Sequence, residues 1–219
     1  MLESAESILR RHAGEFLGIQ EVNNLLEKSS QQYGALIKEV LRVVSVQCIA
    51  EVFRNLVAEG IPIRNIRDIF EALVEWGGKE KDPAALTEFV RIGLKRYLTS
   101  RYVQADRSLP AYVMQPAAEE QIRKANLGAA AGNLPGLAPD AVNLLLSNLQ
   151  VLREALNQPL LENGEILLVA IDIRRQVKKL IENEFPDITV LSYQELVMPV
   201  NIASLGQLSF EAMAQERVA

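Results

Sequence analysis

The sequence predicts an α+β protein, with a helical N-terminal subdomain followed by a small α/β subdomain that contains a βαβ unit. Over about the first 100 residues, apolar side chains recur at steps of three and four, which is the period of an amphipathic helix. Further along, short apolar runs alternate with helical patterns and with a stretch rich in Gly, Ala and Pro. We therefore expect a domain boundary near residue 104.

The first helices are delimited by residues that start or stop a helix. One long helix is predicted at the beginning of the chain, with a bend near Gly18. Ser45 is the expected cap of the next helix, because its hydroxyl can accept a hydrogen bond from a free amide of the first turn. Gly60 should end that helix.

Two more helices follow in the helical part. The helix over about 63–76 has an apolar face and charged side chains elsewhere, and it should end at Gly77. Asp82 and Pro83 start the next helix, since a capping carboxylate satisfies first-turn amides and proline loses no amide partner at that position. Pairs of opposite charge four residues apart can form on the 63–76 helix, at Arg64/Asp68 and Arg67/Glu71.

The α/β part is predicted to alternate strands and helices. The expected elements are a strand over 109–114, a helix over 117–126, a loop over 128–139, a helix over 142–156, a strand over 166–171, a helix from Asp172 to about 184, a strand over 188–191 and one or two strands over 200–210. The strand, helix and strand over 166–191 form a βαβ unit, so those two strands should be parallel.

Composition excludes several classes of function. The net charge of -5 argues against a general affinity for nucleic acid, whose phosphates are bound by Lys- and Arg-rich surfaces. No glycine-rich phosphate-binding run occurs, so ATP and dinucleotides are not supported as cofactors. The longest apolar run, over 166–171, is far shorter than the ~20 residues of a membrane-spanning helix. We expect no cofactor and no metal.

Catalytic chemistry has little support in the sequence. His12, the only histidine, lies on the apolar stripe of its predicted helix, which is typical of a packed structural residue. Cys48, the only cysteine, is expected to be a small buried or half-buried hydrophobe. The alternative is a small α/β enzyme with Asp172 and Glu195 as acids at the carboxyl ends of the parallel strands. Against it, Asp172 is explained as a helix cap, and we assign no catalytic residue.

Two features are candidates for docking a partner protein. Trp76 stands beside two glycines and could be an aromatic anchor, although packing at a helix terminus explains it equally well. A basic cluster follows Asp172, and a solvated helix face balanced by acidic residues is its alternative explanation. The candidate docking residues are Trp76, Arg174, Arg175 and Lys178.

Four stretches carry a resemblance to a known family. They are GEFLGIQEV over 14–22, IPIRNIRDI over 61–69, DIRR over 172–175 and VLSYQEL over 190–196. Together they resemble the FHIPEP family of flagellar and injectisome export-gate proteins, over nearly the whole chain. The segments 74–77 and 193–196 are more similar to the virulence injectisome branch, LcrD/YscV/InvA-like, than to the flagellar branch.

The resemblance implies a place in a larger protein. Family members have an N-terminal membrane domain in the bacterial inner membrane and a cytoplasmic region of four subdomains, which forms a nonameric ring in injectisomes. Residues 1–35 resemble the helix that closes the first subdomain, 36–104 the helical third and 105–219 the α/β fourth. This chain would lie on the cytoplasmic side and reach the membrane only through the missing N-terminal domain. A cytosolic adaptor without a membrane parent is the remaining alternative.

The resemblance also implies partners. They are further copies of the same chain in the ring, other export-apparatus proteins, export chaperones and secreted substrates. The third subdomain is associated with ring contacts, so the subunit-interface candidates are Arg64, Arg67, Asp68 and Glu71. The groove that binds chaperones is framed largely by the first and second subdomains, and we transfer no groove residue to this chain.

Overall fold

The computed structural model describes residues 16–126, 136–155 and 164–211. The chain divides into two compact units, Met1–Arg96 and Tyr97–Ala219, so the division falls within a helix, α6 (Lys95–Tyr102). The correspondence with subdomains that meet near residue 104 stays a prediction. The first part of the helix predicted at the start of the chain, including His12, and most of the predicted 128–139 loop lie outside the described residues.

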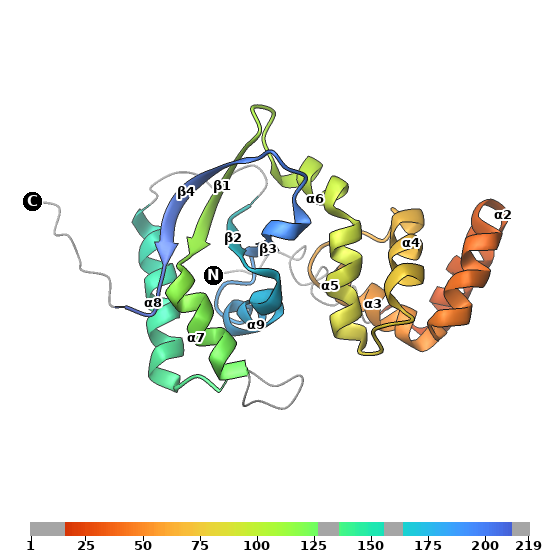
Figure 1. Ribbon diagram of the computed structural model, residues 1–219, viewed down its shortest axis with the longest axis horizontal. Coiled ribbons are helices and arrows are strands. Elements are labelled where there is room, and N and C mark those ends of the chain that lie inside the picture. The colour runs from red at the N-terminus through yellow and green to blue at the C-terminus, as the bar shows by residue number, and fades with distance from the viewer. Residues whose placement is uncertain (1–15, 127–135, 156–163, 212–219) are drawn as a thin grey trace, which may run out of the picture. The chain divides into compact units, whose positions relative to one another are not determined.

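The first unit is helical, as predicted (Figure 1). Its helices are α2 (Ile19–Val43), α3 (Val46–Ala58), α4 (Ile66–Trp76) and α5 (Pro83–Gly93). Gly18 is the N-cap of α2, and the backbone inside this helix departs from helical geometry at Tyr33. None of the described helices is both long enough and apolar enough to cross a membrane.

The start and stop signals read from the sequence act as expected. The Ser45 hydroxyl accepts a hydrogen bond from the Cys48 amide at 3.2 Å, and the Asp82 carboxylate accepts the amides of Ala84 and Ala85. Gly60 follows α3 with a φ of 71°, a left-handed conformation that favours glycine. These local contacts set the helix boundaries of the first unit.

The ends of α2 and α4 approach each other closely at Gly77. A Cβ atom at this position would lie 2.1 Å from a methyl carbon of Val44, so only glycine fits. Lys81 Nζ donates a hydrogen bond to the Gly77 carbonyl at 2.7 Å, which places a cation at the carboxyl end of α4. The interior includes Phe53 and Phe70, whose ring centroids are 6.4 Å apart.

The second unit is built on a four-stranded sheet in the order β3-β2-β1-β4. Its strands are β1 (Ser108–Met114), β2 (Ile166–Val169), β3 (Thr189–Ser192) and β4 (Asn201–Leu208), and every pairing is parallel. The predicted βαβ unit is confirmed as β2, α9 (Ile171–Ile181) and β3. The region predicted as one or two final strands is the single strand β4, which pairs with β1 at the edge.

Two further helices, α7 (Pro116–Asn126) and α8 (Pro139–Ala155), contribute to the hydrophobic core of this unit. A Cβ atom on Gly206 would lie 2.5 Å from Leu152, so α8 packs directly on β4. Two sequence predictions are wrong in detail. The strand predicted over 166–171 ends at Val169. The helix predicted to be capped by Asp172 has Ala170 as its N-cap, and Asp172 lies inside its first turn.

Candidate interaction surfaces

The outer face of α4 carries exposed charges of both signs. Arg67 Nε lies 2.8 Å from Glu71 Oε1, and the two side chains are 66% and 50% exposed. The hydrogen bond to Glu71 is the main reason that the pKa of Arg67 is raised. Asp68 is exposed in the first turn of the same helix, whereas Arg64 precedes the helix and is also exposed. The structure thus brings three of the four interface candidates onto one exposed helix.

Trp76 packs against the neighbouring helix. Its ring stacks on that of Phe89 in α5, with centroids 4.2 Å apart and planes 7° from parallel. Lys79 Nζ lies 4.6 Å from the Trp76 ring centroid, within the range of a cation–π contact. The ring is half-buried, so this geometry supports packing at the helix terminus, with part of the ring still open to solvent.

The basic side chains of α9 reach the outer side of β3. Arg174 is 0% exposed, and its Nη1 donates a hydrogen bond to the Val190 carbonyl at 3.3 Å. Lys178 Nζ donates to the Ile188 carbonyl, also at 3.3 Å. The prediction that these residues lie on a solvated helix face is therefore wrong for Arg174, and a buried guanidinium cannot dock a partner. Arg175 is half-buried.

Glu195 binds a further backbone group at the outer edge of β3. The Thr189 amide donates to the Glu165 carbonyl at 2.9 Å, so Thr189 faces β2 and the residues on either side of it face outward. Ser192 also faces outward, and its amide donates to Glu195 Oε2 at 2.6 Å. Two outward groups of β3, the Val190 carbonyl and the Ser192 amide, are thus capped by Arg174 and Glu195, and Lys178 caps the Ile188 carbonyl just before the strand. Unpaired edge groups otherwise act as a template for another strand.

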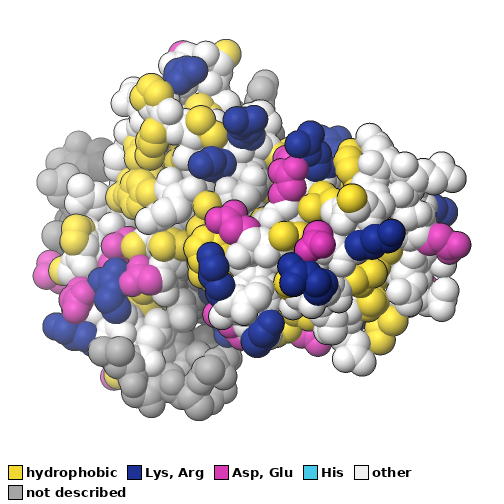
Figure 2. Space-filling view, turned by 45° about the vertical axis from the view of Figure 1, so that its right-hand side comes forward, with side chains coloured by type: hydrophobic (Ala, Val, Ile, Leu, Met, Phe, Trp, Pro, Cys, Tyr) yellow, Lys and Arg dark blue, Asp and Glu magenta, His cyan; other side chains and the backbone are white. Residues whose placement is uncertain are grey.

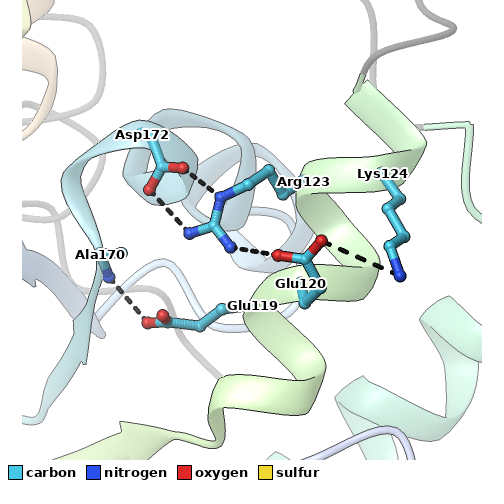
Figure 3. A network of polar contacts seen from close by, with 6 residues as sticks. All are labelled: Glu119, Glu120, Arg123, Lys124, Ala170 and Asp172. Atoms are coloured by element: carbon cyan, nitrogen blue, oxygen red, sulfur yellow. Dashed lines mark hydrogen bonds and ion pairs between the residues drawn. The ribbon is translucent and has the colours of Figure 1, made fainter.

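The other acid of the enzyme alternative is held in a polar network between α7 and α9 (Figure 3). Asp172 accepts hydrogen bonds from Arg123 at 2.5 and 3.2 Å, and Arg123 also pairs with Glu120 at 2.7 Å. Its hydrogen bond to Arg123 lowers the pKa of Asp172. Glu119 Oε1 accepts the Ala170 amide at 2.8 Å, so the protein's own carboxylate occupies the anion position at the start of α9.

These contacts explain both acids without catalysis. Glu195 is 0% exposed and caps the edge of β3, and Asp172 forms an ion pair. Within the described ranges, no cluster of three His, Cys, Asp or Glu side chains could hold a metal ion. Cys48 is half-buried, as predicted, and burial is the main cause that raises the pKa of its thiol. A raised thiol pKa disfavours nucleophilic use.

On the face that Figure 2 draws, surface charge is mixed rather than segregated. Figure 2 shows acidic and basic side chains interspersed over the face it draws, with hydrophobic side chains gathered in a band on the left of the view. Together with the net charge of -5, this mixed pattern is unlike the basic stripe that binds nucleic acid.

Comparison with known proteins gives a consistent answer. The family model described as "FHIPEP family" matches residues 1–201. "Low calcium response locus protein D" of Yersinia pestis is 44% identical over 201 residues, which are 92% of this chain and 28% of that protein. The chain therefore spans less than a third of this relative.

Solved structures with the same fold include a cytosolic domain from a type III secretion system. The "Chlamydia pneumoniae CdsV and CdsO protein complex" contains a chain with a TM-score of 0.84 and 41% identity, over 92% of this chain and 58% of that one. The "nonameric EscV cytosolic domain from the type III secretion system" has a TM-score of 0.77 and 32% identity, over 92% of this chain and 59% of that one.

Proposed function

Because this chain belongs to the FHIPEP family, we propose that it is a C-terminal cytoplasmic part of the export gate of a type III secretion system. In this role, copies of the chain contribute to a ring that helps dock chaperone–substrate complexes and pass proteins to the membrane channel. The observation that carries the proposal is the match to secretion-system cytosolic domains over 92% of the chain, which includes both compact units.

The full-length protein is proposed to lie in the bacterial inner membrane, with this part on the cytoplasmic side. The 28% coverage of the Yersinia relative leaves room for a membrane domain in such a protein. We assign residues 1–35 to the close of a first subdomain, 36–104 to a helical third and 105–219 to an α/β fourth. The family serves in secretion rather than as a known class of enzyme, so we propose no catalytic role.

The exposed charges of α4 are the proposed subunit interface. Arg67, Asp68 and Glu71 present both signs on one helix, with Arg64 just before it. A head-to-tail contact between such a face and another surface of the next copy closes into a ring. The EscV cytosolic domain, a relative in fold and sequence, is nonameric. This relationship supports a ring for the present chain.

Docking of other proteins is proposed at the residues that keep exposed surface. Trp76, Arg175 and Lys178 are half-buried and remain candidates, whereas Arg174 does not. The CdsV relative was solved with CdsO, which supports protein partners as a class. Export chaperones and secreted substrates are the further partners that this role implies.

The ring proposal is tested by native mass over a wide concentration range. The variant is Arg67→Glu, and the matched control is Arg42→Glu, because Arg42 forms a similar exposed pair with Glu39 at 2.9 Å on α2. We expect ring-sized species for the wild type and the control, and their loss for Arg67→Glu. Equal assembly of both variants would remove the interface assignment. A chain that stays monomeric throughout shows that ring contacts require other parts of the protein.

A further inference from the structure

The two edges of the sheet differ in how they are finished. At the β3 edge, charged side chains from α9 and Glu195 cap the outward backbone groups. At the β4 edge, Asn201–Leu208 contains no charged residue and no proline. Charges and prolines are two devices that keep an edge strand from pairing with another chain, and a β-bulge is a third. The β4 strand lacks the first two, and its pairing with β1 contains one register shift, between Ser204 and Gly206.

The backbone of β4 has hydrogen-bonding groups on the side that faces away from β1. The Asn201 amide and the Leu208 carbonyl both bond to the β1 side, at 2.8 and 2.9 Å. The backbone amide and carbonyl groups of successive residues in a strand point to alternate sides. The backbone groups of Ile202 and Ser204 therefore face away from β1. After the bulge in this pairing, the backbone groups of Gln207 do so as well. Within residues 164–211, these outward groups are not taken up by another strand.

The chain that follows β4 leads away from this edge. Asn148 Nδ2, on α8, donates hydrogen bonds to the carbonyls of Ser209 at 3.0 Å and Glu211 at 2.7 Å. Asn148 is 3% exposed, so it makes these hydrogen bonds from a buried position. Residues up to Glu211 are therefore tied to the helix that covers one face of β4, and no strand among the described residues pairs with the lateral edge.

We propose that the open edge of β4 receives an extended segment of a partner protein as an added fifth strand. Only an extended backbone matches alternating amide and carbonyl groups along a strand edge. The exposed side chains of Ala203, Ser204 and Gln207 are uncharged, so the fitting segment carries uncharged side chains opposite them. This inference rests on the proposed docking role and identifies a surface for it.

A partner segment fits this edge better than a second copy of the chain. A continuous sheet through a head-to-tail ring would join the β4 edge of one copy to the β3 edge of the next. The β3 edge is closed by Arg174, Lys178 and Glu195, so that joint is blocked. Pairing of two β4 edges is two-fold symmetric and ends at a dimer, which does not continue around a ring.

The test is hydrogen exchange of the peptide that covers β4. It is compared between the isolated chain and the purified secretion apparatus that contains the full-length gate protein. We expect the outward amides of Ile202, Ser204 and Gln207 to exchange fast in the isolated chain and at least about tenfold more slowly in the apparatus. The Ser192 amide, capped by Glu195, should be slow in both states.

A proline variant identifies the contact. Ser204→Pro removes one outward amide and leaves the β1-facing groups in place, whereas Ser204→Thr keeps the amide and is the control. In the apparatus, protection of the other outward amides should be lost in Ser204→Pro and kept in Ser204→Thr. Unchanged exchange at Ser192 shows that the variant remains folded.

Each other outcome overturns the inference. Fast exchange in both samples means that no strand is added, and slow exchange in the dilute isolated chain means that the chain covers its own edge. Protection that rises with the concentration of the isolated chain assigns the edge to a second copy. Ser204→Pro leaves the α4 face intact, so a failure here is separable from a failure of the ring test with Arg67→Glu.

Discussion

At the scale of single residues, Tyr112 is one of the buried residues of the second unit whose polar atom has no hydrogen-bond partner in the described structure. It is 0% exposed, and its hydroxyl has no hydrogen-bond partner among the residues that the structure describes. Burial, followed by the negative charge of Glu165, raises the pKa of Tyr112 to about 12. A buried hydroxyl without a partner costs about 1–3 kcal/mol, so this position should gain stability when the oxygen is removed.

We expect Tyr112→Phe to raise the free energy of unfolding by about 1 kcal/mol at neutral pH. The raised pKa means that the wild type loses stability relative to the variant as pH rises from about 10, the value for an unfolded tyrosine, through about 12. Urea unfolding across this range measures both effects. A variant less stable than the wild type at pH 7 would show that the hydroxyl has a partner in solution.

Asp172 should make acid stability depend on Arg123. Its pKa is lowered mainly by the Arg123 hydrogen bond, so its contribution is present above the unfolded pKa of about 3.9 and is lost as pH falls through the folded value. The pair is partly exposed, so Asp172→Asn should cost at most about 1 kcal/mol at neutral pH. The difference from the wild type should shrink below about pH 4.

The control for this prediction is the same substitution in an Arg123→Met background, measured by urea unfolding at each pH. Without the Arg123 hydrogen bond, which is the main cause of the lowered Asp172 pKa, the stability difference caused by Asp172→Asn should no longer depend on pH. An Asp172→Asn difference that stays constant down to low pH would contradict the assignment of the ion pair.

At the scale of elements, α3 and α5 are joined by a polar seam. Asn55 Nδ2 donates to Thr87 Oγ1 at 3.1 Å, and Arg91 Nη1 lies 2.9 Å from Glu59 Oε2. The two contacts are one helical turn apart on both helices, so they fix the register of the pair. Arg91 is 1% exposed, so the ion pair with Glu59 helps to compensate a buried charge.

Arg91→Met should destabilise the first unit by about 3 kcal/mol, because it removes a buried cation and the ion pair that this cation forms with Glu59. Adding Glu59→Gln should recover part of that loss, since the uncompensated charge is then removed. A double-mutant cycle by urea unfolding measures the coupling. Additive effects would show that the two side chains do not interact in solution.

The capping of the β3 edge by Arg174 should affect both stability and association. Arg174→Met removes the donor to the Val190 carbonyl and should cost about 1–3 kcal/mol, whereas Arg175→Met, at the next position, should cost less. The uncapped edge should also increase association through β3, which light scattering at matched stability detects. Equal effects of the two variants would mean that Arg174 contributes packing alone.

At the scale of the whole molecule, salt should separate the two proposed contacts. The α4 interface uses exposed charges, and raising salt from about 0.1 M to about 1 M shortens the screening length from about 10 Å to about 3 Å. Ring assembly measured by native mass should weaken over this range. Strand addition at β4 uses uncharged backbone groups, so its exchange protection should hold. Ring assembly that is unaffected by salt would point to an apolar interface.

The sequence alone identified the features that depend on near neighbours. Ser45 and Asp82 cap the helices that they were predicted to cap, and Arg67 pairs with Glu71 four residues away. The parallel βαβ unit followed from the order of strand, helix and strand. The family followed from motifs spread along the chain, and the match over residues 1–201 confirms it.

The tertiary structure decided the features that depend on strand order. The position of β4 beside β1 makes it an edge strand, and the position of β3 at the other edge turns Arg174 from a predicted surface charge into a buried cap. Asp172 caps no helix because α9 already begins at Ile171, and the Asp172 carboxylate is instead bound by Arg123, which is distant in the sequence. Periodicity reports which face of an element is apolar, but only the folded sheet determines which backbone groups lack a partner strand and which side chains reach them.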